Sequence, residues 1–210
     1  EADRRQGAAT QLMGLQMEHF RGAGGRALYL GTGFDSSAYH IYHGHGFRSL
    51  ESGSGQMEYY SDRRESFHAD WFAQGPVEIQ GTSWGHWPTT GPLFTADLPG
   101  TIRCAPLGLL GRASTEGAWL RLLHTDPARA RVLAAGAGAV VGAAVWGEHP
   151  QWPQTTLVDV FCHPSFWEWG AELLGSLELP PTERCVAVSD DGCPTKGDIL
   201  AAAGFASAAQ

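Results

Sequence analysis

Residues 4–10 have the sequence Arg4-Arg5-Gln6-Gly7-Ala8-Ala9-Thr10 and lead directly into a helical pattern that continues to Phe20. Small residues allow the backbone to approach a ligand closely. The first turn of a helix carries unpaired N–H groups at the positive end of the helix dipole. The two arginines add full positive charge at the same place. Residues 4–10 therefore predict a helix start that either holds an anion such as phosphate or is an ordinary solvated basic turn.

Helices and strands are predicted to alternate after this stretch, which is typical of an α/β sheet with helices packed on its faces. We expect a helix over residues 8–20, a strand over residues 26–30, and a second helix with Asp35 or Ser36 as its N-cap. Residues 47–50 and 56–61 are expected to form a hairpin. In the second half the pattern predicts strands over 77–79, 131–135, 139–146, 155–162 and 185–189, and helices over 113–124, 166–177 and 196–203.

The two halves share one order of elements, which suggests an internal repeat. Each half has a helix, a strand of about five residues, a second helix and then a Gly-Phe pair, Gly46-Phe47 in the first and Gly204-Phe205 in the second. We therefore expect a first unit over residues 1–62, a linker over 63–75 and a second unit over 76–210. Since the first residues resemble the middle of a motif, we expect the opening strands of the first unit to be missing from this sequence.

Composition limits the class of protein. The chain has 210 residues, of which 43% are hydrophobic, and a formal net charge of −8, which argues against nucleic acid as its main partner. No apolar run is long enough to span a membrane, and no secretory signal is present at the start. The four cysteines are widely spaced and lack a CxxC pair, so we expect reduced thiols in a cytoplasmic protein rather than disulfides or a zinc site.

Three segments of the first half together resemble the GNAT superfamily of acyltransferases. Residues 4–9 fit the (Gln/Arg)-x-x-Gly-x-(Gly/Ala) loop of that family, and residues 28–32 are similar to the strand that follows it. Residues 38–47 are similar to the family's Ala-x-x-x-Tyr-x-x-x-Gly-Phe ending. The second half resembles the same fold over residues 140–205, most clearly in residues 158–164. The resemblance implies a tandem GNAT with an α/β (α+β) fold, in which each unit has a mixed, mostly antiparallel sheet with helices on both faces.

The resemblance implies acetyl-CoA or another acyl-CoA as donor and an amine as acceptor. Backbone amides of the 5–10 loop would surround the pyrophosphate. Asp35 stands where the family often has an Asn that contacts the pantetheine arm, and a carboxylate cannot donate a hydrogen bond there, whereas Ser37 could. The residues expected to bind the cofactor are Arg4, Arg5, Gln6, Gly7, Ala8, Ala9, Thr10, Asp35, Ser37, Ala38 and Tyr42.

Tyr42 lies four residues before Gly46 and matches the family's general-acid tyrosine, which would protonate the leaving thiolate. The alternative is that Tyr42 only packs its helix against the sheet. The general base is not assigned, because the family often takes it from the strands that are missing here. His40, His43 and His45 lie near the expected site. No carboxylate or cysteine lies at a spacing that would complete a set of metal ligands with them, so we expect solvated side chains and no metal.

The second half departs from the family pattern both at the loop that would hold the pyrophosphate and at the position of the acid tyrosine. The segment after His163-Pro164 is short, lacks a basic residue and carries Trp167 and Trp169. Leu200 occupies the position of the acid tyrosine and cannot give a proton. We expect the second unit to keep the fold without the standard chemistry, with or without CoA binding. Most of six tryptophans are expected in the core or between the units, and the alternative is that they line an acceptor or acyl pocket: Trp84, Trp87, Trp146, Trp152, Trp167 and Trp169.

Two further expectations follow from the residues and the resemblance. Cys162 and His163 with Asp159 could suggest a nucleophile, but neighbouring side chains on a strand point to opposite faces, which opposes a Cys-His pair.

The expected function is transfer of an acyl group from acyl-CoA to a small-molecule amine, possibly in bacterial natural-product metabolism, by a monomer or homodimer. The alternatives are a non-catalytic acyl-CoA-binding or sensing module and a protein lysine acetyltransferase.

Overall fold

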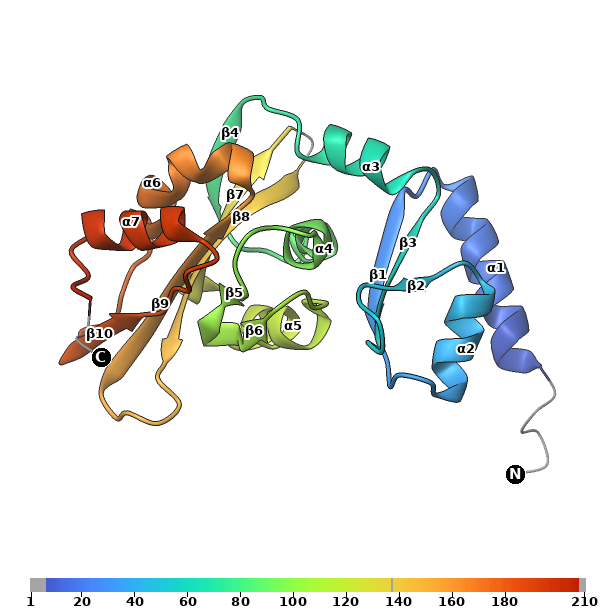
Figure 1. The fold of residues 1–210 in the computed structure, drawn as a ribbon, viewed down its shortest axis with the longest axis horizontal. Helices are drawn as coiled ribbons and strands as arrows, with labels where there is room; N and C mark the ends of the chain where they lie inside the picture. The colour runs from blue at the N-terminus through green and yellow to red at the C-terminus, as the bar shows by residue number, and fades with distance from the viewer. Residues whose placement is uncertain (1–6, 137, 208–210) are drawn as a thin grey trace. The chain divides into compact units, whose positions relative to one another are not determined.

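The computed structural model describes residues 7–136 and 138–207 and divides the chain into two compact units (Figure 1). The first unit extends to Asp70 and the second begins at Trp71. The described residues contain seven α-helices and ten strands in mostly antiparallel sheets, which confirms the predicted α/β (α+β) class. Residues 63–75, which we expected to be a linker, contain a helix. No helix among the described residues is both long and apolar enough to cross a membrane.

The first unit is a three-stranded antiparallel sheet in the order β1-β3-β2, with helices α1 and α2 on one face (Figure 1). Strand alternation explains this arrangement, because Leu28, Leu30, Met57 and Tyr59 all contact the core beneath the two helices. The elements of this unit are α1 (Ala8–Gly22), β1 (Ala27–Gly31), α2 (Ser37–Gly44), β2 (Arg48–Ser49), β3 (Gln56–Tyr60) and α3 (Arg64–Trp71), whose last residue begins the second unit.

Local signals set the ends of the helices in the first unit. Gly24 has a left-handed φ of 76°, and the N–H of Gly25 donates to the carbonyl of Phe20 at 2.9 Å, which ends α1. Ser36 is the N-cap of α2, since its hydroxyl accepts from the N–H of Tyr39 at 3.1 Å. Of the two predicted N-caps, Ser36 is therefore correct and Asp35 is wrong.

The second unit has a five-stranded sheet in the order β10-β9-β8-β7-β4, in which only β9 and β10 are parallel. Helices α4 and α5 lie on one face of this sheet and α6 and α7 on the other (Figure 1). The main elements are β4 (Val77–Gly81), α4 (Trp87–Thr95), β5 (Ile102–Cys104), β6 (Leu109–Leu110), α5 (Glu116–Thr125), β7 (Ala130–Ala135), β8 (Ala139–Glu148), β9 (Thr155–Cys162), α6 (Gly170–Gly175), β10 (Arg184–Ala187) and α7 (Pro194–Ala202).

Three short 3-10 helices complete the second unit: η1 (Ala105–Leu107), η2 (Pro127–Arg129) and η3 (Pro164–Trp169). The helix predicted over 166–177 is therefore divided between η3 and α6. The large core of this unit includes Trp119 and Phe161, with Trp87, Trp146, Trp167 and Trp169 packed around it. Trp84 and Trp152, by contrast, are exposed, so four of the six tryptophans pack on the core, in agreement with the expectation for most of them.

Candidate functional site

The start of α1 is exposed and has no side-chain cap. Gly7 has a left-handed φ of 77°, a conformation that favours glycine, and its carbonyl accepts from the N–H of Gln11 at 2.9 Å. Ala8, Ala9 and Thr10 are exposed in the first turn, which contains no acidic residue. The predicted residues Arg4, Arg5 and Gln6 lie outside the described residues. The described part of the predicted loop therefore presents backbone N–H groups at the surface, where they can meet an anion.

The start of α2 supplies the second group of predicted residues. Asp35 has a left-handed φ of 58°, and its carboxylate lies 2.9 Å from Nε2 of His40 in an exposed pair. Ser37 and Ala38 follow the Ser36 cap and are exposed. The Asp35 carboxylate, which precedes α2, is thus engaged with His40 of that helix, while the small side chains of Ser37 and Ala38 leave the first turn open.

Both groups lie at the same end of the first unit. In Figure 1 the N-terminal ends of α1 and α2 and the carboxyl end of β1 point toward one end of the unit. Two helix dipoles therefore direct their positive ends to the same region. Residues 7–10 and residues 35–38 therefore present helix starts at one end of the unit, and each helix start favours an anion.

Tyr42 lies on the inner side of α2, one turn before Gly46. Its half-buried ring packs against the ring of Phe47, with 5.7 Å between the centroids. No residue in the described ranges forms a hydrogen bond with its hydroxyl. The ring of Tyr42 therefore packs in the core, while its phenolic O–H is available to another partner. Both the packing role and the general-acid role of Tyr42 are compatible with this arrangement.

The three histidines in and just after α2 have local contacts or partial burial. His40 pairs with Asp35, the ring of His43 stacks on Tyr39 at 6.0 Å, and His45 is half-buried at the end of the helix. Within the described residues, no group of three or more His, Cys, Asp or Glu side chains is arranged to hold a metal ion.

The opposite face of the first sheet carries a polar cluster that the sequence reasoning missed. The Tyr29 hydroxyl donates to the Tyr60 oxygen at 3.1 Å, and the Tyr60 hydroxyl donates to buried Glu58 at 2.9 Å. Burial raises the pKa of Tyr60 to about 12 and raises that of Tyr29 further, so both phenols are neutral at pH 7. His68 and Arg64 from α3 complete the cluster. The alternation of polar residues in β1 and β3 was its only sequence signal.

The second unit repeats the helix ending of the first. The N–H of Phe47 donates to the carbonyl of Tyr42 at 3.1 Å, and the N–H of Phe205 donates to the carbonyl of Leu200 at 3.0 Å. The preceding glycines, Gly46 and Gly204, have φ values of 97° and 92°. The strand before each helix has nearly the same spacing to these residues, because β1 begins at Ala27, 20 positions before Phe47, and β10 begins at Arg184, 21 positions before Phe205. Strand, helix and Gly-Phe pair are therefore equivalent in the two units.

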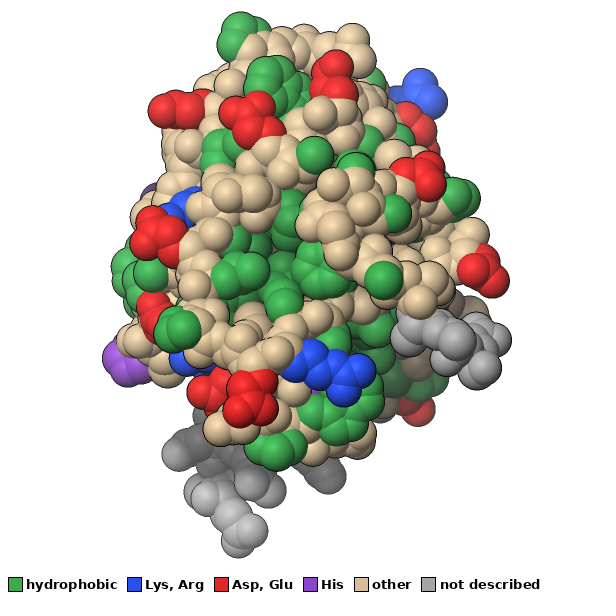
Figure 2. All heavy atoms as spheres, turned by 90° about the vertical axis from the view of Figure 1, so that its left-hand side faces the viewer, with side chains coloured by type: hydrophobic (Ala, Val, Ile, Leu, Met, Phe, Trp, Pro, Cys, Tyr) green, Lys and Arg blue, Asp and Glu red, His purple; other side chains and the backbone are tan. Residues whose placement is uncertain are grey.

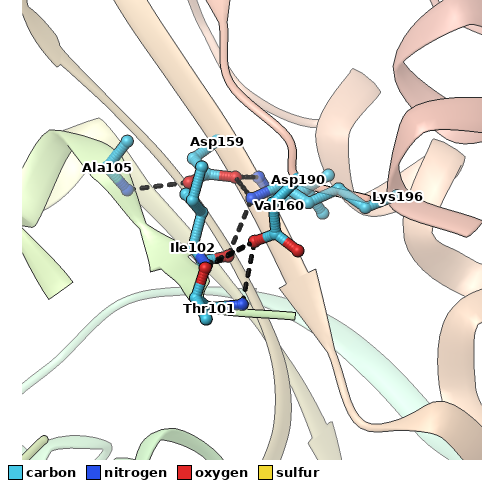
Figure 3. Close-up of polar contacts among 7 residues, drawn as sticks. All are labelled: Thr101, Ile102, Ala105, Asp159, Val160, Asp190 and Lys196. Carbon is cyan, nitrogen blue, oxygen red and sulfur yellow. Dashed lines mark hydrogen bonds and ion pairs between the residues drawn. The ribbon is translucent and has the colours of Figure 1, made fainter. Parts of the chain in front are cut away.

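The first turn of α7 is occupied by a buried ion pair (Figure 3). Lys196, the only lysine of the chain, lies 2.5 Å from the carboxylate of Asp159 on β9, and both side chains are 1% exposed. The Lys196 ammonium also donates to the carbonyl of Ile102 at 3.0 Å. Asp159 accepts from the N–H groups of Ala105 and Val160, each at 2.7 Å. Burial nevertheless raises the pKa of Asp159 to about 6, and Lys196 and the two N–H donors reduce that rise.

A second carboxylate fixes the neighbouring loop (Figure 3). Asp190 accepts from the N–H groups of Thr101 and Ile102 at 2.8 and 2.7 Å, and from Gly192 at 2.9 Å. These donors hold the pKa of Asp190 below its usual value, although the limited burial of the carboxyl opposes them. Asp159, in the middle of β9, and Asp190, three residues after β10, together hold residues 101–105 against these two strands.

The two units therefore differ at equivalent positions. Lys196 precedes Phe205 by as many residues as Ala38 precedes Phe47. In the first unit this position is Ala38, whose side chain is small and exposed. In the second unit it is Lys196, whose ammonium is buried. The start of η3 also differs from that of α1, because Nδ1 of His163 accepts from the N–H of Ser165 at 3.3 Å and caps it.

The surroundings of Cys162 and His163 do not suit a catalytic pair. Cys162 is buried, and burial raises the pKa of its thiol beyond the physiological range. The His163 ring stacks on Phe72, with the centroids 4.0 Å apart, and burial lowers its pKa to about 4. All four cysteines are unpaired thiols, and only Cys185 is exposed.

No protein-family model and no curated protein matches this chain.

Proposed function

We propose that the protein is a GNAT-like N-acyltransferase whose first unit binds acyl-CoA and transfers its acyl group to a small-molecule amine. The observation that carries the proposal is the convergence of two exposed helix starts, residues 7–10 and 35–38, at the carboxyl end of β1. Helix N-termini of this kind favour phosphate groups. The proposal is also supported by the spacing of Tyr42 to Gly46-Phe47, which matches that of the general-acid tyrosine in the resembled family.

In this proposal the amine nitrogen attacks the thioester carbonyl, and the C–S bond then breaks. The departing thiolate takes the proton of the Tyr42 hydroxyl, which has no hydrogen-bond partner among the described residues. Its ring packs against Phe47 in the core of the unit. The group that takes the proton from the amine is not assigned. The free thiols agree with a reducing compartment, and we propose the cytoplasm.

A thiol-release assay with acetyl-CoA and a panel of primary amines tests the proposal. Tyr42→Phe should lower turnover by roughly 100-fold or more and leave the affinity for CoA unchanged, since it removes only the acid proton. Tyr39→Phe is the matched control on the same helix, because the Tyr39 hydroxyl is engaged with Ser49 at 3.0 Å. It should keep turnover within a few-fold of the wild type, about 1 kcal/mol or less in barrier.

Three results would change the proposal. Equal turnover of the Tyr42→Phe variant and the wild type would remove the acid role. CoA binding without turnover of any amine would favour an acyl-CoA-sensing module. Acetylation of protein lysines without turnover of small amines would favour a protein acetyltransferase.

A further inference from the structure

The loop between β1 and α2 carries an exposed aromatic ring, at the end of the first unit where the two helix starts lie. Phe34 directly precedes Asp35 and is 52% exposed. Exposed apolar side chains are common on protein surfaces, and Figure 2 shows others gathered on the face of the chain that lies at the left of Figure 1. Exposure by itself therefore does not mark a ligand site, and the argument for Phe34 rests on its support and its position.

The backbone around Phe34 is held by direct contacts. The N–H of Thr32 donates to the carbonyl of Gly55 at 2.9 Å, and the N–H of Ser36 donates to the carbonyl of Gly33 at 3.2 Å. A Cβ at position 55 would overlap the carbonyl oxygen of Thr32 and lie 2.9 Å from the nitrogen of Phe34, so this close approach of two loops requires glycine. Backbone contacts therefore set the position of Phe34, although its ring is not buried.

Tyr39 of α2 supports the Phe34 ring. The two rings meet edge to face, with 5.2 Å between their centroids and 67° between their planes. The hydroxyl of Tyr39 is itself engaged with Ser49 at 3.0 Å, which holds the supporting ring in place. An edge-to-face contact covers at most one face of either ring, so Tyr39 leaves at least one face of Phe34 open. A flat aromatic group can stack on that open face.

We propose that the open face of Phe34 stacks on the adenine ring of the CoA donor, an inference that rests on the proposed acyl-CoA function. In CoA the adenine is joined through a ribose to the pyrophosphate, which the proposed function places at the helix starts of residues 7–10 and 35–38. Phe34 adjoins the second of these in the chain, so the phosphates and the base are bound side by side. Stacking of a base requires an exposed ring face of this kind. Phe34 therefore favours a donor that carries the nucleotide over one that ends at the phosphate of the pantetheine arm.

Calorimetric titration of the full chain with CoA and with phosphopantetheine, which lacks the adenosine part, tests the stacking. Phe34→Ala should weaken CoA binding by roughly tenfold or more, because the base loses its partner, and should leave phosphopantetheine binding within about twofold. Phe34→Trp should keep the affinity for CoA, because it restores an aromatic face. Leu15→Ala is the matched control, since Leu15 is an exposed apolar residue of α1, at 65%, and it should leave both affinities unchanged.

The outcomes separate the stacking from the proposed function. If the wild type binds CoA and Phe34→Ala binds it equally well, the donor site is present and the stacking is wrong. Equal weakening of CoA and phosphopantetheine by Phe34→Ala would also overturn the stacking, because Phe34 would then contact the arm rather than the base. The same holds if Phe34→Trp loses as much CoA affinity as Phe34→Ala. If the wild type binds no CoA at all, the proposed function fails and the stacking fails with it.

Discussion

Lys196 shows what a single residue decides in this protein. The only lysine of the chain is used in the interior, where it joins α7 to Asp159 on β9 and to the backbone of β5. A buried pair of this kind costs desolvation energy, which its partners offset only while both charges are present. The same ammonium occupies the first turn of the helix whose equivalent in the first unit is open. One residue therefore both ties α7 to the sheet and occupies the helix start that is open in the first unit.

Removing one charge of the pair should destabilise the second unit strongly. We expect Lys196→Met to lower the free energy of unfolding by about 3–5 kcal/mol, because it leaves the Asp159 carboxylate buried without its cation. Asp70→Asn removes the exposed Arg26–Asp70 pair and should cost about 1 kcal/mol or less. Urea unfolding at pH 7 measures both variants. A loss under about 1 kcal/mol for Lys196→Met would contradict the role of the buried pair.

His163 should make the second unit sensitive to acid. Burial lowers its pKa to about 4 in the folded chain, against an ordinary value of about 6.5, so the folded state resists protonation of this ring. The stability that the neutral ring contributes is complete above about pH 6.5 and decreases as the pH falls toward 4. His163→Asn keeps a capping oxygen for the N–H of Ser165 and removes the titration. Thermal unfolding from pH 7 to pH 4 should show a smaller decrease for this variant, and an equal decrease would refute the assignment.

At the scale of elements, much of the fold could be predicted, because strands and helices that end at a glycine are recognisable from the local sequence pattern. The strands of the second sheet and helices α1, α2 and α7 were expected close to their observed bounds. Helix α4 was missed, because Pro88 and Pro92 obscure the helical pattern. Helix α3 was missed because its polar composition resembles a linker.

The candidate site was predictable only in part, for a physical reason. Gly7 and Tyr42 lie in local motifs, so sequence spacing could identify them. The pairing of Lys196 with Asp159 joins a helix and a strand far apart in the chain, and no local pattern encodes it. The Tyr29–Tyr60–Glu58 chain likewise depends on the register of β1 with β3.

The Ser36 cap gives a prediction for a single helix. Ser36→Ala should lower the stability of the first unit by about 1 kcal/mol, because the N–H of Tyr39 loses its acceptor. Ser37→Ala changes a neighbouring exposed serine in the first turn of the same helix and should change stability by less than about 0.5 kcal/mol. Urea unfolding followed by circular dichroism compares the two. Equal effects would show that Ser36 is not the cap.

At the scale of the whole molecule, the two units differ in the size of their cores. The first has a small cluster formed by Met17, Phe47, Met57 and Tyr59, whereas the second has a continuous core beneath a five-stranded sheet. A small core offsets less of the conformational entropy lost on folding. The unit with the open helix starts is therefore also the less extensively packed one.

This difference predicts unequal protection in the two units. Amide hydrogen exchange of the full chain should be slower in β8 and β9 than in β1 and β3.

Amine-reactive labelling of Lys196, located by mass spectrometry, should be absent in the native protein and appear only as urea unfolds the second unit. Rapid labelling of Lys196 under native conditions would contradict its burial.

The central claim is that the first unit alone holds the anionic donor, and calorimetric titration of CoA into the full chain tests it most directly. We predict one CoA per chain, with binding abolished by Gly7→Val, which strains the left-handed turn at the start of α1. Gly53→Val is the matched control, since Gly53 has a φ of 76° and equally open surroundings in another turn of the same unit, and it should bind normally. An absence of binding, two CoA per chain, or equal affinity of the Gly7→Val variant would contradict the claim.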